Sequence, residues 1–166
     1  DGNSGGASGI AIDYTSTNDS YIYNNTIRTS GTNYNYGIFI DTGAYANLVR
    51  SNNISTFGSN WNYGIYLSTN AGSNIIERNV IKPNGTGTAN HGIVIDSAGA
   101  STASSGNIVR DNNISSSAVG GLKYGISLAA GSSAAVQGTT NSGNRISLSG
   151  YDGNNGIQFQ PSGADS

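Results

Sequence analysis

The chain has 166 residues, of which 25 are glycine, 10% are charged and none is cysteine, and its formal net charge is −2. The seven basic residues are scattered singly and no apolar run approaches the roughly 20 residues that span a bilayer, which argues against a nucleic-acid interface and a membrane span. The length of the chain fits a single domain, which we expect over residues 1–166. Since the chain has no cysteine, disulfides and thiolate metal sites are excluded, and packing and backbone pairing must stabilise this domain. We expect no cofactor.

A motif of glycine followed by alternating apolar residues recurs along the whole chain. Its glycines are separated by 28, 27, 28, 33 and 31 residues and stand at Gly9, Gly37, Gly64, Gly92, Gly125 and Gly156. The apolar residues occupy every second position, which is the periodicity of a β-strand and not of a helix. Stacked copies of this strand would form two buried columns, Ile10, Ile38, Ile65, Ile93, Ile126 and Ile157 in one, and Ile12, Ile40, Leu67, Ile95, Leu128 and Phe159 in the other.

A second motif follows the first in the early repeats and places an asparagine shortly before an isoleucine. Its first copy is Tyr21–Ile27 and its last clear copy is Ile108–Ile114. Stacked amide side chains can donate to one coil and accept from the next at a turn. The same alignment sets Glu77 between Arg50 and Arg110, so that like charges do not stack. We therefore predict an internal asparagine ladder of Asn25, Asn52, Asn79, Asn112 and Asn144.

The two motifs recur in the same order at a period of about 28 residues, and together they resemble the parallel β-helix repeats of the pectin-lyase-like superfamily over residues 9–159. The resemblance implies an all-β fold, a right-handed parallel β-helix of about five to six coils. The coils here are longer than the common ones because of loops expected at 28–35, 56–62, 82–90 and 115–123. The superfamily contains polysaccharide lyases and hydrolases, phage tailspikes, adhesins and surface proteins, so the fold does not decide the activity.

Three carboxylates directly follow the repeated strand and are the first candidates for catalysis: Asp13, Asp41 and Asp96. Neighbouring coils lie about 4.8 Å apart, which is compatible with the roughly 5–5.5 Å carboxylate separation of retaining glycosidases. The alternative is that these side chains accept backbone N–H bonds and hold the turn. His91, the single histidine, is a further candidate, but its column contains tyrosines and is also explained by a ladder of stacked rings. No metal site is expected.

Aromatic side chains gather on the outward face of the repeated strand. Phe39 and Tyr66 occupy outward positions in neighbouring repeats, and Trp61 and Tyr34 stand in the adjoining loops. Exposed apolar patches often mark contact surfaces, and the apolar face of a sugar ring packs well on an aromatic side chain. We therefore expect these four residues to contact a carbohydrate ligand or another subunit.

Several asparagines satisfy the Asn-x-Ser/Thr acceptor pattern for glycosylation, namely Asn18, Asn24, Asn53, Asn84 and Asn113. Asn84 stands in one of the long loops and is therefore the best candidate for a glycan. Matches at the other positions are also expected by chance, because the chain is rich in asparagine, serine and threonine.

The ends of the expected solenoid are open, since no amphipathic helix flanks the strands that contain Ile10 at one end and Ile157 and Phe159 at the other. We therefore expect either a segment of a longer solenoid or a subunit that stacks head to tail with copies of itself. The leading hypothesis is an extracellular or cell-surface structural protein, adhesin-like or fibre-forming. The alternative is a carbohydrate-active β-helix, either a polysaccharide hydrolase or lyase or a glycan-binding module of the tailspike type.

Overall fold

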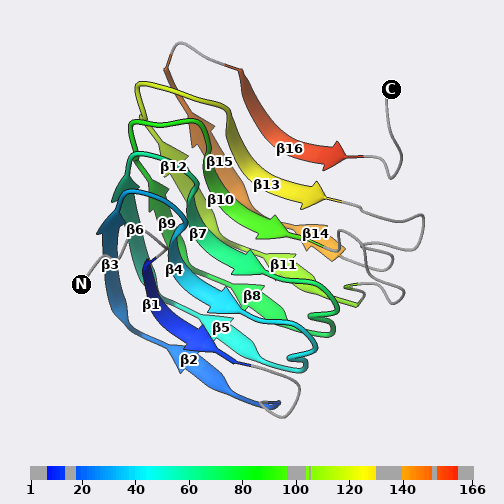
Figure 1. Ribbon diagram of the computed structural model, residues 1–166. Coiled ribbons are helices and arrows are strands. Elements are labelled where there is room, and N and C mark those ends of the chain that lie inside the picture. Colours follow the sequence, from blue (N-terminus) through cyan, green and yellow to red (C-terminus); the bar gives the residue numbers. More distant parts are fainter. Residues whose placement is uncertain are drawn as a thin grey trace, which may run out of the picture.

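The computed structural model describes residues 7–13, 18–96, 104, 106–129, 140–150 and 153–160, and these contain sixteen strands and no helix. The strands form three parallel sheets of six, five and five strands, and consecutive strands of the chain belong to consecutive sheets. The chain therefore passes through each sheet once per coil (Figure 1). Five coils have three strands each, and the last strand begins a sixth. The predicted all-β parallel β-helix is confirmed.

Each sheet collects the equivalent strands of successive coils. Sheet A, which carries the glycine motif, consists of β1 Ala7–Ile12, β4 Asn35–Ile40, β7 Asn62–Leu67, β10 Asn90–Ile95, β13 Lys123–Ala129 and β16 Asn154–Gln160. Sheet B consists of β2 Tyr21–Tyr23, β5 Leu48–Arg50, β8 Ile75–Glu77, β11 Ile108–Arg110 and β14 Thr140–Ser142. Sheet C consists of β3 Thr26–Gly31, β6 Asn53–Gly58, β9 Val80–Pro83, β12 Asn113–Ser116 and β15 Arg145–Leu148.

The core lies between the three sheets and contains the two predicted apolar columns. The register of sheet A pairs Ile38 with Ile65 and continues in the same way from β1 to β16. Ile38 and Ile65 are fully buried, together with isoleucines of the other sheets such as Ile54. Burying each one contributes roughly 1.5–3 kcal/mol. The last coil differs, since Ile157 is 42% and Phe159 67% exposed.

The predicted asparagine ladder is present at the corner between sheets B and C. The Oδ1 atom of Asn79 accepts hydrogen bonds from the backbone N and the Nδ2 of Asn52, at 2.9 and 3.0 Å. Its own Nδ2 donates to Asn112 Oδ1 and to the Val49 carbonyl, each at 3.0 Å. The same amide-to-amide bond joins all the predicted members, Asn25, Asn52, Asn79, Asn112 and Asn144.

Two further asparagine ladders, which are not among the predictions from the sequence, close the other two corners of the coil. At the corner between sheets A and B the members are Asn47, Asn74 and Asn107. At the corner between sheets C and A they are Asn35, Asn62 and Asn90. Lys123 takes the next position of this third ladder and is fully buried, with its Nζ donating to the Gly121 carbonyl at 3.1 Å. Every corner is thus held by side-chain amides.

The predicted alternation of charge on sheet B is confirmed. Glu77 lies between two arginines of the neighbouring coils, with its Oε1 3.3 Å from Arg50 Nε and its Oε2 2.6 Å from Arg110 Nη2. The Glu77 side chain is nearly buried, whereas both arginines remain partly exposed. One carboxylate therefore links three coils in the predicted register.

All four expected loops are wrong at their ends. Strands β3, β6, β9 and β12 continue to Gly31, Gly58, Pro83 and Ser116, so residues 28–31, 56–58, 82–83 and 115–116 are strand and not loop. The last residue of each expected loop is the first residue of the next strand of sheet A. Thr29 and Thr56 explain the difference in β3 and β6, because they are buried and continue the inward positions of these strands. Their hydroxyl groups make them look like loop residues in a hydropathy pattern, although their position is that of core residues.

Candidate functional site

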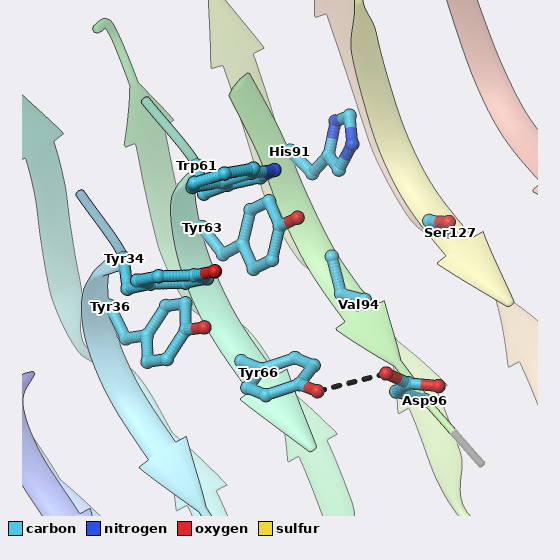
Figure 2. A pocket seen from close by; sticks show the side chains of 9 residues that line it. All are labelled: Tyr34, Tyr36, Trp61, Tyr63, Tyr66, His91, Val94, Asp96 and Ser127. Carbon is cyan, nitrogen blue, oxygen red and sulfur yellow. Dashed lines mark hydrogen bonds between the residues drawn. The ribbon is translucent and has the colours of Figure 1, made fainter. Parts of the chain in front are cut away.

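A pocket of about 350 Å³ opens on the outer face of sheet A, over β4, β7, β10 and β13 (Figure 2). Most of its wall is aromatic, and one valine, one carboxylate and one serine complete it. The lining residues are Tyr34, Tyr36, Trp61, Tyr63, Tyr66, His91, Val94, Asp96 and Ser127. This wall brings together ligand-binding candidates and catalytic candidates that the sequence patterns assign to separate columns. Four lining residues, Tyr36, Tyr63, Val94 and Ser127, are not among the predicted site residues, although the strand periodicity points Val94 and Ser127 outward with Tyr66.

One side of the pocket is a ladder of stacked rings that crosses four coils. Tyr36 stacks on Tyr63 with ring centroids 5.5 Å apart, Tyr63 on His91 at 5.1 Å, and His91 on Tyr124 at 4.4 Å. The interplanar angles in these three pairs are 18°, 8° and 19°. The ladder of stacked rings expected in the column of His91 therefore exists, and three of its rings line the pocket.

His91 is held as a neutral ring within this ladder. Burial lowers the pKa of its imidazole to about 4, so the ring is uncharged near neutral pH. Its Nδ1 accepts a hydrogen bond from the Tyr124 backbone N at 3.2 Å, which places the proton of the neutral ring on Nε2. The lone pair that a general base needs is therefore occupied, and this geometry suits a hydrogen-bond donor better than the predicted catalytic base.

Tyr34 and Trp61 form the second aromatic element, above the ladder. Their rings are stacked at 4.6 Å with an interplanar angle of 11°. Each residue directly precedes a strand of sheet A, and each has a left-handed backbone, with φ of 51° for Tyr34 and 46° for Trp61. A bulky side chain rarely adopts this conformation. The same conformation recurs at other corners of the coil, for example at Ser51, Arg78 and Asp111, so it belongs to the turn geometry of the solenoid.

Tyr66 connects the aromatic wall to the carboxylate. Its hydroxyl donates a hydrogen bond to Asp96 Oδ2 at 2.9 Å. Burial, together with the charge of Asp96 and this hydrogen bond, raises the pKa of the Tyr66 phenol well above its usual value, so the phenol stays protonated. Phe39 stacks on Tyr66 at 5.6 Å but does not line the pocket, which sets it apart from the other three predicted ligand-binding residues.

The predicted catalytic carboxylates occupy the expected column but have different surroundings. Asp41 Oδ1 accepts hydrogen bonds from the backbone N and the Oγ1 of Thr42, at 2.6 and 3.2 Å, and so holds the turn after β4. Asp13 lies one coil before it and is exposed, while Ser68 separates Asp41 from Asp96. Asp96 alone belongs to the pocket wall. In the part of the chain that the structure describes, no three His, Asp or Glu side chains converge on a site for a metal ion.

The candidate glycosylation sites lie in different settings. Asn53, Asn113 and Asn24 are exposed. Asn84 is half-buried, and its Oδ1 accepts a hydrogen bond from the Ser117 backbone N at 3.0 Å. Asn18 is also half-buried, and its Oδ1 accepts from the Tyr45 backbone N at 3.2 Å. Glycosylation of these residues stays a prediction, and the exposed members of the set offer the freer amides.

Comparison with known proteins supports the fold. The profile of a family described as right-handed beta helix region matches residues 3–146. No curated protein and no solved structure shows significant similarity to the chain. No helix capable of crossing a membrane occurs within the described ranges.

Proposed function

The chain belongs to the family of right-handed β-helix proteins, and we propose that it is an extracellular, adhesin-like solenoid that binds carbohydrate in the aromatic pocket of sheet A. The observation that carries this proposal is the composition of the pocket wall. Five tyrosine and tryptophan rings from successive coils surround one space, and the β-helix holds them in a fixed order. The solenoid is thus the scaffold, and the pocket is the binding site.

The wall combines the two kinds of contact that a sugar makes. Aromatic faces pack against the apolar C–H groups of a sugar ring, while the sugar hydroxyls need hydrogen-bond partners. Figure 2 shows the hydroxyl groups of Tyr36, Tyr63 and Tyr66 pointing toward the side where Val94, Asp96 and Ser127 lie. The apolar and polar parts of the wall therefore face the same space. Its volume of about 350 Å³ suits a small ligand or one segment of a longer chain.

Binding is a better proposal than hydrolysis. A glycosidase of the usual kind needs two carboxyl groups that flank the bond, roughly 5–9.5 Å apart. Among the described residues of the pocket wall, Asp96 is the one carboxylate, and Asp41 is engaged with Thr42 in its own turn. The site can therefore orient and contact a sugar, but it lacks the pair of carboxyl groups that hydrolysis requires.

Removal of the Tyr34 ring tests the binding site. Trp61 is the single tryptophan of the chain and lies in the pocket, so its fluorescence reports binding directly. In a screen of neutral, acidic and amino-sugar oligosaccharides, we expect at least one to shift the Trp61 emission. Tyr34→Ala should weaken the binding of that oligosaccharide about tenfold, because the stacked ring face is lost. Tyr45→Ala removes an exposed ring outside the pocket and serves as the control. Equal affinity of the Tyr34 variant and the unchanged protein would contradict the assignment.

Head-to-tail assembly is the second candidate function, and it is favoured by apolar side chains that are exposed on the last strand that the structure describes. Phe159 is 67% and Ile157 42% exposed, and both continue the core columns of sheet A. Ile10 is half-buried at the other end of the same column. Because both edges carry the same motif, one copy can continue the strand order of the next, which generates a fibre and not a closed ring.

Sedimentation velocity over a range of concentrations tests this assembly. We expect the unchanged protein to form oligomers that grow with concentration, and Ile157→Asp to remain monomeric because a charge would enter the apolar joint. Val119→Asp places the same charge at a site that is 70% exposed and outside sheet A, and it should assemble normally. A protein that stays monomeric at high concentration would rule out the stacking.

A further inference from the structure

The ionisable side chains of the described pocket wall give it a negative charge and no positive one. Asp96 is the single carboxylate among the lining residues that the structure describes, and burial lowers the pKa of His91 so that its ring is neutral. No lysine or arginine belongs to this wall. A bound anion would therefore lie close to a carboxylate, and no basic side chain of the described wall would offset the repulsion, so a uronic acid is disfavoured as the ligand.

The negative charge of Asp96 acts on several of the tyrosine hydroxyl groups that line the pocket. Its carboxylate accepts the hydrogen bond from Tyr66. Burial first, then a neighbouring tyrosine, and then the charge of Asp96 raise the pKa of Tyr36 to about 12 and that of Tyr63 still further. These phenols come from two different coils, β4 and β7. A negative potential thus extends along the polar side of the space in which the ligand would lie.

The aromatic rings favour the same sign of charge in the ligand. The faces of tyrosine and tryptophan rings are electron-rich and attract an ammonium group within about 6 Å, most strongly where water is excluded. Rings and carboxylate line one space, with Tyr66 hydrogen-bonded to Asp96 and packed at a tilted angle against Tyr36 of the aromatic wall. A ligand with an apolar ring face and a protonated amine would meet both kinds of group at once.

We infer that the ligand of this pocket is an amino sugar with a free, protonated amine beside Asp96, and that N-acetylated and acidic sugars are disfavoured. This inference rests on the proposed carbohydrate function and narrows it to one substrate class. The rings recognise the sugar face, the phenol hydroxyls recognise its hydroxyl groups, and Asp96 selects the charge.

Oligosaccharides of equal length made of glucosamine, N-acetylglucosamine or galacturonic acid separate these ligands by charge. Affinity is measured by Trp61 fluorescence and by calorimetry on the full chain. We expect the glucosamine oligomer to bind at least tenfold more tightly than the N-acetylated one, and the galacturonic acid oligomer to bind weakest. Asp96→Asn should remove the preference for the free amine, so that the glucosamine and N-acetylglucosamine oligomers bind with similar affinity. Asp41→Asn removes a carboxylate outside the pocket and should change neither affinity.

The outcomes distinguish this inference from the function on which it rests. If the N-acetylated or acidic oligomer binds as tightly as the glucosamine oligomer, or if Asp96→Asn leaves the ratio unchanged, the charge selection is wrong while carbohydrate binding stands. If tetramethylammonium binds as tightly as the glucosamine oligomer, the site recognises an organic cation and the sugar assignment fails. If no oligosaccharide changes the Trp61 signal or the calorimetric heat, both proposals fail.

Discussion

Asn79→Ala is expected to lower the free energy of unfolding by about 3 kcal/mol, because the amide side chain of Asn79 makes four hydrogen bonds inside the solenoid. In the variant, the backbone N of Asn52 and the carbonyl of Val49 lose their hydrogen bond to Asn79, and no other asparagine of the ladder replaces it. Both residues are buried. Water cannot reach these groups unless the corner opens, so each carries a penalty of about 1–3 kcal/mol.

Asn53→Ala is the matched control for this substitution. Asn53 is one residue beyond a member of the same ladder, but its side chain is exposed, and water can replace whatever bonds it makes. Urea unfolding of the two variants should therefore give a midpoint shift for Asn79→Ala several times larger than for Asn53→Ala. Similar and small shifts for both would show that the ladder contributes little to stability.

The repeated motifs were sufficient to predict the fold, because each position of a β-helix recurs at the same place in every coil. Strand periodicity in the glycine motif placed Ile38 and Ile65 in one column, and the ladder of Asn52 and Asn79 was aligned by the isoleucine that follows it. Asn74 carries a comparable marker, because Asn47, Asn74 and Asn107 each stand directly before the apolar pair that opens the second motif. The same motif could therefore have predicted this second ladder, whose spacings of 27 and 33 residues equal those of the ladder that was predicted.

The candidate site was predictable in its parts but not in its assembly. Tyr34, Trp61 and Tyr66 were selected as an outward aromatic group, and Asp96 was selected as one of a column of carboxylates. Their meeting depends on two features that a sequence pattern does not contain. One is the left-handed backbone that turns Tyr34 and Trp61 over the sheet, and the other is the hydrogen bond that a tyrosine makes to a carboxylate 30 residues away.

Gly64→Ala is the second substitution with a large expected effect, and it explains why the motif requires glycine. Gly64 has no positive φ, so the requirement is for space and not for backbone conformation. A Cβ atom at this position would lie 2.1 Å from Ile81 Cγ2, on sheet C across the core, and 2.7 Å from the carbonyl oxygen of Gly92 in the next coil. Equivalent collisions arise at Gly37 and Gly92, so the strands of sheets A and C approach each other closely along the solenoid.

The carbonyl of Gly92 belongs to the strand that follows β7 in sheet A, and it cannot move away without disturbing the pairing of these strands. We therefore expect Gly64→Ala to cost about 3 kcal/mol of unfolding free energy, at the upper end of the usual range for overpacked cores. Gly156 occupies the same motif position in the last coil, and a Cβ there would meet nothing within 4 Å. Gly156→Ala should accordingly leave the thermal midpoint unchanged or raise it slightly, because alanine has less freedom to lose on folding. A Gly64 variant as stable as the Gly156 variant would show that sheets A and C can separate enough to admit a methyl group.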